Sequence, residues 1–264
     1  MEKLILIKLG GSVITDKSKP FTAGIDVIKR LVSEIKQAGR VSGGKIIIGH
    51  GSGSFGHTVA AKYKTQEGMV NEDSIKGLSL TADAAIKINR IVVGECLNQD
   101  LPAVSFSPLS FIYSKNGKPL AVFTFQIEKA LEIGLLPVVY GDVIMDEVTG
   151  FCIYSGEKTL DLLAIKLSKY YKIDRIIMVG DTDGVWDKKG KTIVKITPQN
   201  FSGIKKFLSG SASADVTGGM LHKVEESLNL AKKEKISTVI INGKKRGNLL
   251  KAIAGKSVVS TIIS

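Results

Sequence analysis

Residues 3–12, KLILIKLGGS, decide the fold, because an apolar run ends there at two glycines and a serine. Such a run is typical of a buried parallel strand, and adjacent glycines let backbone N–H groups approach an anion closely. Lys8 adds a positive charge at the end of the run, and Lys17 follows nine residues later on the same loop. We therefore expect a strand that delivers a phosphate-binding loop to one edge of a sheet.

Short apolar runs alternate with helical periodicity along the rest of the chain. We expect strands at 45–48, 103–106, 136–140, 175–179, 238–241 and 258–263, and helices at 25–35, 74–97, 157–168 and 221–235. Gly39 is expected to stop the first helix. Hairpins are expected at 111–122, which contains an Asn-Gly turn, and at 143–153. This alternation predicts a single α/β domain over residues 1–264, with a mostly parallel sheet covered on both faces.

The composition excludes several classes of protein. With 264 residues, 44% hydrophobic and 23% charged, the chain is neither disordered nor collagen-like. No apolar run is long enough to span a bilayer. The apolar stretch at the N-terminus is too short for a signal peptide. Cys96 and Cys152 do not form a disulfide framework in a chain of this size, so we expect two reduced thiols and a cytoplasmic protein.

The formal net charge is +12, and most of the excess lies in the last third of the chain. These charges are nearly all lysines on amphipathic stretches, which is typical of a solvated, Lys-rich surface. Attraction of nucleotide phosphates is the second interpretation. Few aromatic residues are interleaved with the lysines, which disfavours a nucleic-acid-binding patch.

A second glycine-rich loop is found at residues 50–57, HGSGSFGH. It matches the G-x-G-x-x-G pattern, but the acidic residue that a dinucleotide site needs at the end of the next strand is missing. The residues near that position, 70–75, indicate the start of a helix instead. We therefore interpret the loop as a second phosphate cradle, in which His57 supplies a positive charge.

Two further loops suit an anion. Residues 180–186, GDTDGVW, follow a buried strand, and residues 215–223, DVTGGMLHK, open a helix whose N-terminus favours negative charge. Each could also be an ordinary turn. Together, four such loops with Lys8, Lys17 and Lys223 indicate phosphoryl transfer, which depends on positioning and charge neutralisation. The chain contains neither a P-loop nor a protein-kinase catalytic loop.

These motifs, with YGDV at 140–143 and YSG at 154–156, resemble the amino acid kinase family over nearly the whole chain. The GSFGH sequence that ends at His57 resembles the archaeal isopentenyl phosphate kinase branch specifically. The resemblance implies a three-layer αβα sandwich, with an acceptor lobe over about residues 1–170 and a nucleotide lobe over about residues 171–264. It also implies transfer of a phosphoryl group from ATP to isopentenyl phosphate, with Mg²⁺.

The resemblance also assigns site residues by position. The ATP-binding residues are Lys8, Gly10, Gly11, Ser12, Gly53, Asp181, Gly219 and Lys223. His57 is expected to bind the acceptor's own phosphate, helped by Ser52, Gly53 and Gly156. Lys17 is expected to stabilise the transferring group, so that Lys17, His57 and Lys8 are the expected catalytic residues. No metal ligand is assigned.

Two positions depart from the family pattern. Ser52 replaces a glycine, and its N–H remains usable only if the backbone there avoids positive φ. Lys158 stands where a second acidic residue is expected, which counts against a metal role of the loop at 155–158 and against an acceptor role beyond that of Gly156. The acceptor's hydrocarbon tail is expected to contact apolar residues of the helix at 74–97.

Other functions remain open at this point. A different acceptor is possible: a phosphonate antibiotic, an acyl carboxylate, a carbamate or a nucleotide monophosphate. A carboxylate acceptor has no need of His57 beside the glycines. A regulator that binds nucleotide without catalysis has no need of Lys17. The expected partner is a small-molecule substrate rather than nucleic acid or a membrane, and the family resemblance implies a homodimer.

Overall fold

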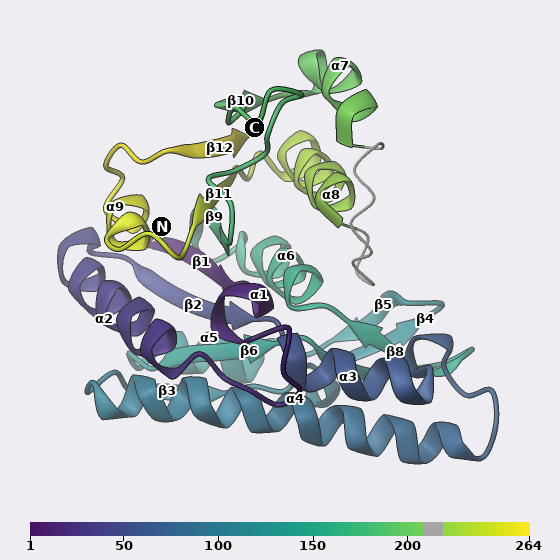
Figure 1. Ribbon diagram of the computed structural model, residues 1–264. Helices are drawn as coiled ribbons and strands as arrows, with labels where there is room; N and C mark the ends of the chain where they lie inside the picture. Colours follow the sequence, from purple (N-terminus) through teal and green to yellow (C-terminus); the bar gives the residue numbers. More distant parts are fainter. Residues whose placement is uncertain (209–218) are drawn as a thin grey trace.

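The computed structural model describes residues 1–208 and 219–264. In these ranges the main element is an eight-stranded sheet (Figure 1). Its strand order is β10 (Lys195–Ile196), β12 (Ser260–Ile263), β11 (Thr238–Asn242), β9 (Lys172–Gly180), β1 (Lys3–Leu9), β2 (Lys45–His50), β6 (Leu136–Tyr140) and β3 (Ala103–Ser105). Neighbouring strands run parallel except β11 and β12. The predicted mostly parallel sheet is confirmed.

Helices cover both faces of this sheet, as the alternating side chains of β1 require. Ile5, Ile7 and Leu9 belong to one buried cluster, whereas Leu4 and Leu6 belong to the other. The first cluster packs under α1 (Gly11–Ile14), α2 (Ile25–Ser42), α3 (Gly53–Tyr63), α4 (Asp73–Asn98) and α9 (Asn248–Ile253). The second packs under α5 (Phe125–Glu132), α6 (Gly156–Leu167), α7 (Pro198–Leu208) and α8 (Gly219–Glu234). The result is a three-layer αβα arrangement.

A smaller sheet contains both predicted hairpins. Its strand order is β5 (Lys118–Val122), β4 (Ile112–Lys115), β7 (Asp142–Asp146) and β8 (Gly150–Tyr154). The Asp146 carboxylate joins the two hairpins, because it accepts hydrogen bonds from Gly117 N, Thr149 N and the Ser114 hydroxyl. Burial alone raises the pKa of Asp146, but these hydrogen bonds hold it well below its usual range. Short 3-10 turns precede α4 (η1, Thr65–Glu67) and β4 (η2, Pro108–Ser110).

Two predictions about the first half of the chain are wrong. The first helix does not stop at Gly39 but continues to Ser42, and Gly43 ends it with a φ of 64°. A helix commonly ends where a glycine can adopt this left-handed conformation, and Gly39 does not adopt it. The predicted loop at 50–57 is a loop only as far as Ser52, because α3 begins at Gly53.

Cys96 is buried, Cys152 is half-buried, and both thiols are free. None of the described helices, including the 26-residue α4, is both long and apolar enough to cross a membrane.

Candidate active site

The parallel strands deliver their C-terminal ends to a single cavity of about 550 Å³. Its wall includes Lys8 from β1, Gly51 after β2, Gly141 after β6 and Gly180 from β9. Open α/β sheets bind their ligands at this edge. The cavity is therefore where the chemistry of this fold is expected.

Most of the predicted site residues line this cavity. They are Lys8, Gly10, Gly11, Ser12, Lys17, Ser52, Gly53, His57, Gly156, Asp181 and Lys223. Gly219 is not in the wall, but it begins α8 next to Met220, which is. Residues 215–218 of the predicted fourth loop lie outside the described residues. Segments that are far apart in the sequence thus meet at one place.

The loops meet so closely that side chains cannot fit between them. A Cβ on Gly11 would lie 2.7 Å from Gly53 Cα, and a Cβ on Gly156 would lie 2.5 Å from the His50 carbonyl oxygen. Gly53 also has a φ of 50°, and a Cβ there would collide with the Thr15 hydroxyl. Glycine is therefore required at these crossings. Backbone groups, rather than side chains, form much of the wall.

Two helices begin at this wall. Ser52 and Gly53 lead into α3, and Ser155 and Gly156 lead into α6. The first backbone N–H groups of a helix lack intrahelical acceptors, so such ends favour an anion. Ser52 has a φ of −80°, which a serine adopts without strain. The backbone at Ser52 therefore avoids positive φ, which is the condition under which its N–H remains usable.

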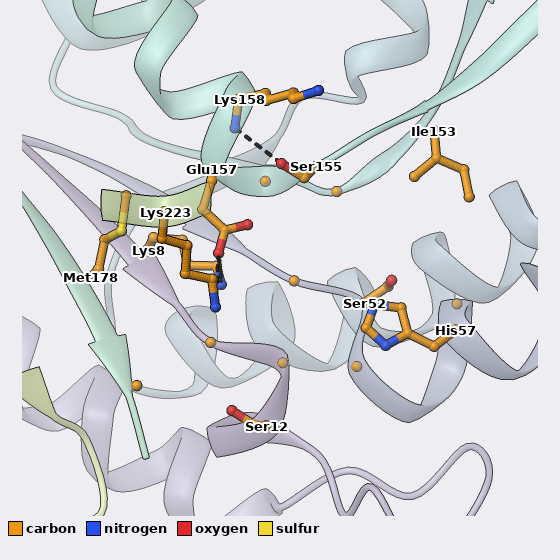
Figure 2. Close-up of a pocket in the computed structure, with 18 of the residues that line it drawn as sticks. Lys8, Ser12, Ser52, His57, Ile153, Ser155, Glu157, Lys158, Met178 and Lys223 are labelled. Atoms are coloured by element: carbon orange, nitrogen blue, oxygen red, sulfur yellow. Dashed lines mark hydrogen bonds and ion pairs between the residues drawn. The ribbon is translucent and has the colours of Figure 1, made fainter. Parts of the chain in front are cut away.

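Three charged side chains form the electrostatic centre of the cavity, as Figure 2 shows. Lys8 Nζ lies 2.6 Å from Glu157 Oε1, and Lys223 Nζ lies 3.8 Å from the same oxygen. Burial alone raises the pKa of Glu157, but the charges of Lys8 and Lys223 lower it to about 2. Glu157 is therefore ionised and holds two lysines at one point.

The sequence reading missed Glu157. The motif recognised in the sequence covers only residues 154–156, and Glu157 and Lys158 were considered only because Lys158 departs from the family pattern. Glu157 is the second residue of α6, and a glutamate in a first helical turn usually just complements the helix dipole. Its contact with Lys8 spans 149 positions, so no local pattern reveals it.

His57 and Lys17 belong to different segments of the cavity wall. His57 is half-buried on α3, one turn after Gly53, and its ring lies beside Ser52 in Figure 2. Lys17 is exposed and follows α1 on the loop that leads to α2. Both line the cavity, so each can reach a ligand there.

The two ends of the cavity differ in character. One end is walled by small side chains of α3 and α4 and by β8, namely Ala60, Ala61, Thr81, Ala85 and Ile153. The other is walled by β9 and the turn after it, by β11 and by α8, through Met178, Asp181, Thr182, Met220, His222 and Ile240. Thr81 and Ala85 are thus the residues of the 74–97 helix that face the cavity, which the sequence could not select.

Lys158 also belongs to the wall, but in Figure 2 its side chain extends away from Lys8 and Glu157. Its backbone N–H donates to the Ser155 hydroxyl, which caps α6. Within residues 1–208 and 219–264, no group of three or more Asp, Glu, His or Cys side chains is arranged to hold a metal ion. Glu157 is already paired with the two lysines.

Comparisons with known proteins agree with this geometry. The model of the amino acid kinase family matches residues 3–242. Isopentenyl phosphate kinases from Methanocaldococcus jannaschii and Methanothermobacter thermautotrophicus are 36% and 34% identical to this chain, over 96% and 99% of both proteins. A solved structure of an isopentenyl phosphate kinase has 30% identity and a TM-score of 0.81, and covers 98% of this chain and 100% of that one. The chain belongs to the amino acid kinase family.

Proposed function

We propose that this protein transfers the γ-phosphate of ATP to isopentenyl phosphate, which gives ADP and isopentenyl diphosphate. One observation carries the proposal: a single cavity joins a glycine cradle beside His57 to a wall of small, mostly apolar side chains. A phosphate with a short hydrocarbon tail fits such a site. The relatives named isopentenyl phosphate kinase support the same substrate.

In this proposal the two ends of the cavity hold the two substrates. Lys8, Gly10, Gly11, Ser12 and Gly53 bind the β- and γ-phosphates, and Asp181, Gly219 and Lys223 bind the rest of the nucleotide. His57, Ser52 and Gly156 bind the acceptor's phosphate, and the tail lies against Ala60, Thr81 and Ala85. The acceptor lobe then comprises about residues 1–170 and the nucleotide lobe about residues 171–264.

The transfer needs charge neutralisation more than proton chemistry. An oxygen of isopentenyl phosphate forms a bond to the γ-phosphorus, and the bond from that phosphorus to the bridging oxygen of ADP breaks. The electron pair leaves with ADP. A phosphate monoester already carries a negative oxygen near pH 7, so no general base is required. Lys8, Lys17 and Lys223 offset the charge that spreads over the transferring group.

Mg²⁺ is expected to accompany ATP. The described residues contain no cluster of metal ligands, so they do not form a site that coordinates the ion by protein side chains alone. Mg²⁺ commonly retains several waters and binds through substrate phosphates. We propose that it enters and leaves with the nucleotide, and we assign no step to it.

The test is a coupled ADP-release assay with Mg-ATP and five acceptors: isopentenyl phosphate, fosfomycin, glutamate, carbamate and UMP. We expect isopentenyl phosphate to be turned over about a hundredfold faster than the others, since binding of both its phosphate and its tail stabilises the transition state. Turnover of another acceptor instead would support a kinase activity but overturn isopentenyl phosphate as the substrate. No turnover of any acceptor would favour a regulator that binds nucleotide.

His57→Ala separates the two ends of the cavity. We expect kcat/KM for isopentenyl phosphate to fall about a hundredfold, because a charge-assisted contact to its phosphate is lost. KM for ATP should change less than about twofold. Steady-state kinetics with each substrate varied in turn measures both. A larger effect on ATP than on isopentenyl phosphate would contradict the assignment of His57 to the acceptor.

We also propose that the protein is a cytoplasmic homodimer. The support is the resemblance to its family. Light scattering on the purified chain measures the mass in solution, and a mass near 28.3 kDa would overturn the dimer.

A further inference from the structure

His50 is a buried imidazole at the end of β2, between the acceptor loop and α4. Its ring has no exposed surface and stacks on Tyr140, with ring centroids 5.6 Å apart. Burial lowers the pKa of His50 to about 4; the Gly51 carbonyl opposes this shift, and the charge of Lys8 adds to it. The ring is therefore neutral at pH 7. Unlike His57, it cannot supply a positive charge to a phosphate.

The hydrogen bonds of His50 determine which ring nitrogen carries the proton. Nδ1 lies 3.1 Å from the Gly51 carbonyl oxygen, which can only accept, so Nδ1 must donate. Nε2 lies 3.1 Å from Asn89 Nδ2, which can only donate, so Nε2 must accept. The Asn89 amide is oriented in turn by the Ser105 hydroxyl, which donates to Oδ1 at 2.6 Å. The chain of donors thus runs in one direction, from Ser105 to Gly51.

This chain also fixes the next peptide group. The Gly51 carbonyl and the Ser52 N–H belong to one planar trans peptide, so they point in opposite directions. Because His50 holds the carbonyl toward the buried ring, the N–H is directed the other way, on the side where Ser52 lines the cavity. Among the described residues, no acceptor is found for the backbone N–H of Ser52. The group is therefore available to a ligand.

We propose that His50 and Asn89 are positioning residues that orient the Ser52 N–H toward the acceptor's phosphate. This inference rests on the proposed function, in which Ser52 contacts that phosphate. Gly51 has no side chain to restrain the peptide. Without the bond from Nδ1, the peptide can rotate and present its carbonyl oxygen to an anion. A preorganised donor avoids that repulsion in the transition state.

The first test is the tautomer of His50. Long-range ¹H–¹⁵N spectra distinguish a protonated ring nitrogen from an unprotonated one. The chain has only three histidines, so spectra of His57→Ala and His222→Ala identify the signals of His50. We expect a neutral ring with the proton on Nδ1 at pH 7. A proton on Nε2, or a charged ring, would overturn the inference without any variant of the network.

The second test is Asn89→Asp, which keeps the shape of Asn89 but removes its donor. A carboxylate draws the His50 proton to Nε2, so that the Nδ1 lone pair faces the Gly51 carbonyl. At about pH 8.5 we expect KM for isopentenyl phosphate to rise about tenfold, with KM for ATP unchanged. If the pair takes up one proton, Nδ1 donates again. Acceptor KM should therefore recover as the pH falls to about 6.

Several ionisable groups face His50 and must be separated from this effect. Lys8 on β1 is paired with Glu157 of α6, Tyr140 on β6 stacks on the ring, and Asp142 begins β7. Burial raises the pKa of Asp142 to about 6, so the unmodified enzyme can itself change over this range. The pH profile of Asn89→Asp is therefore read as a ratio to that of the unmodified enzyme.

Cys96→Ala is the matched control, because Cys96 is buried in the apolar core on the same helix, seven residues after Asn89. We expect it to lower stability without changing acceptor KM or its pH dependence. If Asn89→Asp raised acceptor KM by the same factor at every pH, or raised KM for ATP as much as acceptor KM, the role of Asn89 would be structural only and the inference would be overturned. Failure of the proposed function is distinguished by the unmodified enzyme, which would then not phosphorylate isopentenyl phosphate at all.

Discussion

At the scale of single residues, Glu157 is the most consequential side chain that the sequence did not reveal. It is buried and holds Lys8 and Lys223 at one point, so that two positive charges meet the phosphates together. Breaking a buried ion pair leaves an uncompensated charge and is costly. The residue should therefore affect both stability and catalysis.

Glu157→Gln tests this dual role. We expect a loss of about 3 kcal/mol in the free energy of unfolding, because Lys8 loses its partner while buried. Saturating ATP should restore part of that stability, since its phosphates take the place of the lost carboxylate. Denaturant unfolding with and without ATP measures both effects. Glu147→Gln is the control, because its pair with Lys115 at 2.8 Å is exposed, and it should cost less than about 1 kcal/mol.

Asp161 presents the opposite case, one turn after Glu157 on α6. Its Oδ1 is buried and has no hydrogen-bond partner among the described residues. Burial and the charges of Glu226 and Glu157 raise the pKa of Asp161 to about 7. Between its ordinary pKa of 3.8 and about 7, the folded state therefore binds more protons than the unfolded state, and stability falls as the pH rises.

Asp161→Asn should remove this pH dependence. At pH 8 we expect the variant to be more stable than the unmodified protein by on the order of 2 kcal/mol. The gain should shrink as the pH falls toward 4, where the folded carboxyl is protonated and the unfolded one is only about half ionised. Thermal or urea unfolding across this range measures the difference. A gain of the same size at pH 4 and pH 8 would contradict the ionisation argument.

At the scale of elements, the sequence predicted every strand of the large sheet except β10, and both hairpins, because apolar runs and turn residues are local signals. It failed where a tertiary contact decided the outcome. α2 passes through Gly39 and ends only at Gly43, which takes the left-handed conformation. Residues 53–57 begin α3 although glycines and serines usually favour loops, because the segment packs against α1 and α4. Packing overrode local preference at α3, and backbone conformation selected Gly43 over Gly39 at the end of α2.

Gly53 and Gly94 form a matched pair that tests whether a glycine in a helix is required by its surroundings. Gly53→Ala places a Cβ against Thr15 at a positive φ, so we expect a loss of more than about 2 kcal/mol in stability or an inactive acceptor site. Gly94 lies within α4, and a Cβ there meets no atom within 4 Å. Gly94→Ala should stabilise the protein by about 0.5–1 kcal/mol. Unfolding curves and the kinase assay measure the stability and the activity of both variants. Equal changes in stability and activity in the two variants would refute the steric argument.

At the scale of the whole molecule, the candidate site follows from topology. Most of the site residues that the sequence assigned lie in the cavity wall, because glycine-rich loops at strand ends are visible in the chain. It could not identify the partner that Lys8 acquires, Glu157, or select Thr81 and Ala85 as the residues of α4 that line the cavity. The contact between Lys8 and Glu157 joins β1 to α6 across 149 positions.

The net charge of +12 gives the last prediction, because both proposed substrates are anions. Lys8, Lys17 and Lys223 face the cavity, and most of the remaining excess is spread over the C-terminal third. Long-range attraction of this kind is screened by salt. We therefore expect kcat/KM for ATP and for isopentenyl phosphate to fall about three- to tenfold between roughly 20 and 300 mM KCl. Steady-state kinetics at constant pH measures the trend, and viscosity-matched sucrose controls for slower diffusion. A flat response would mean that the surface lysines serve solubility alone and that recognition depends on contacts within the cavity.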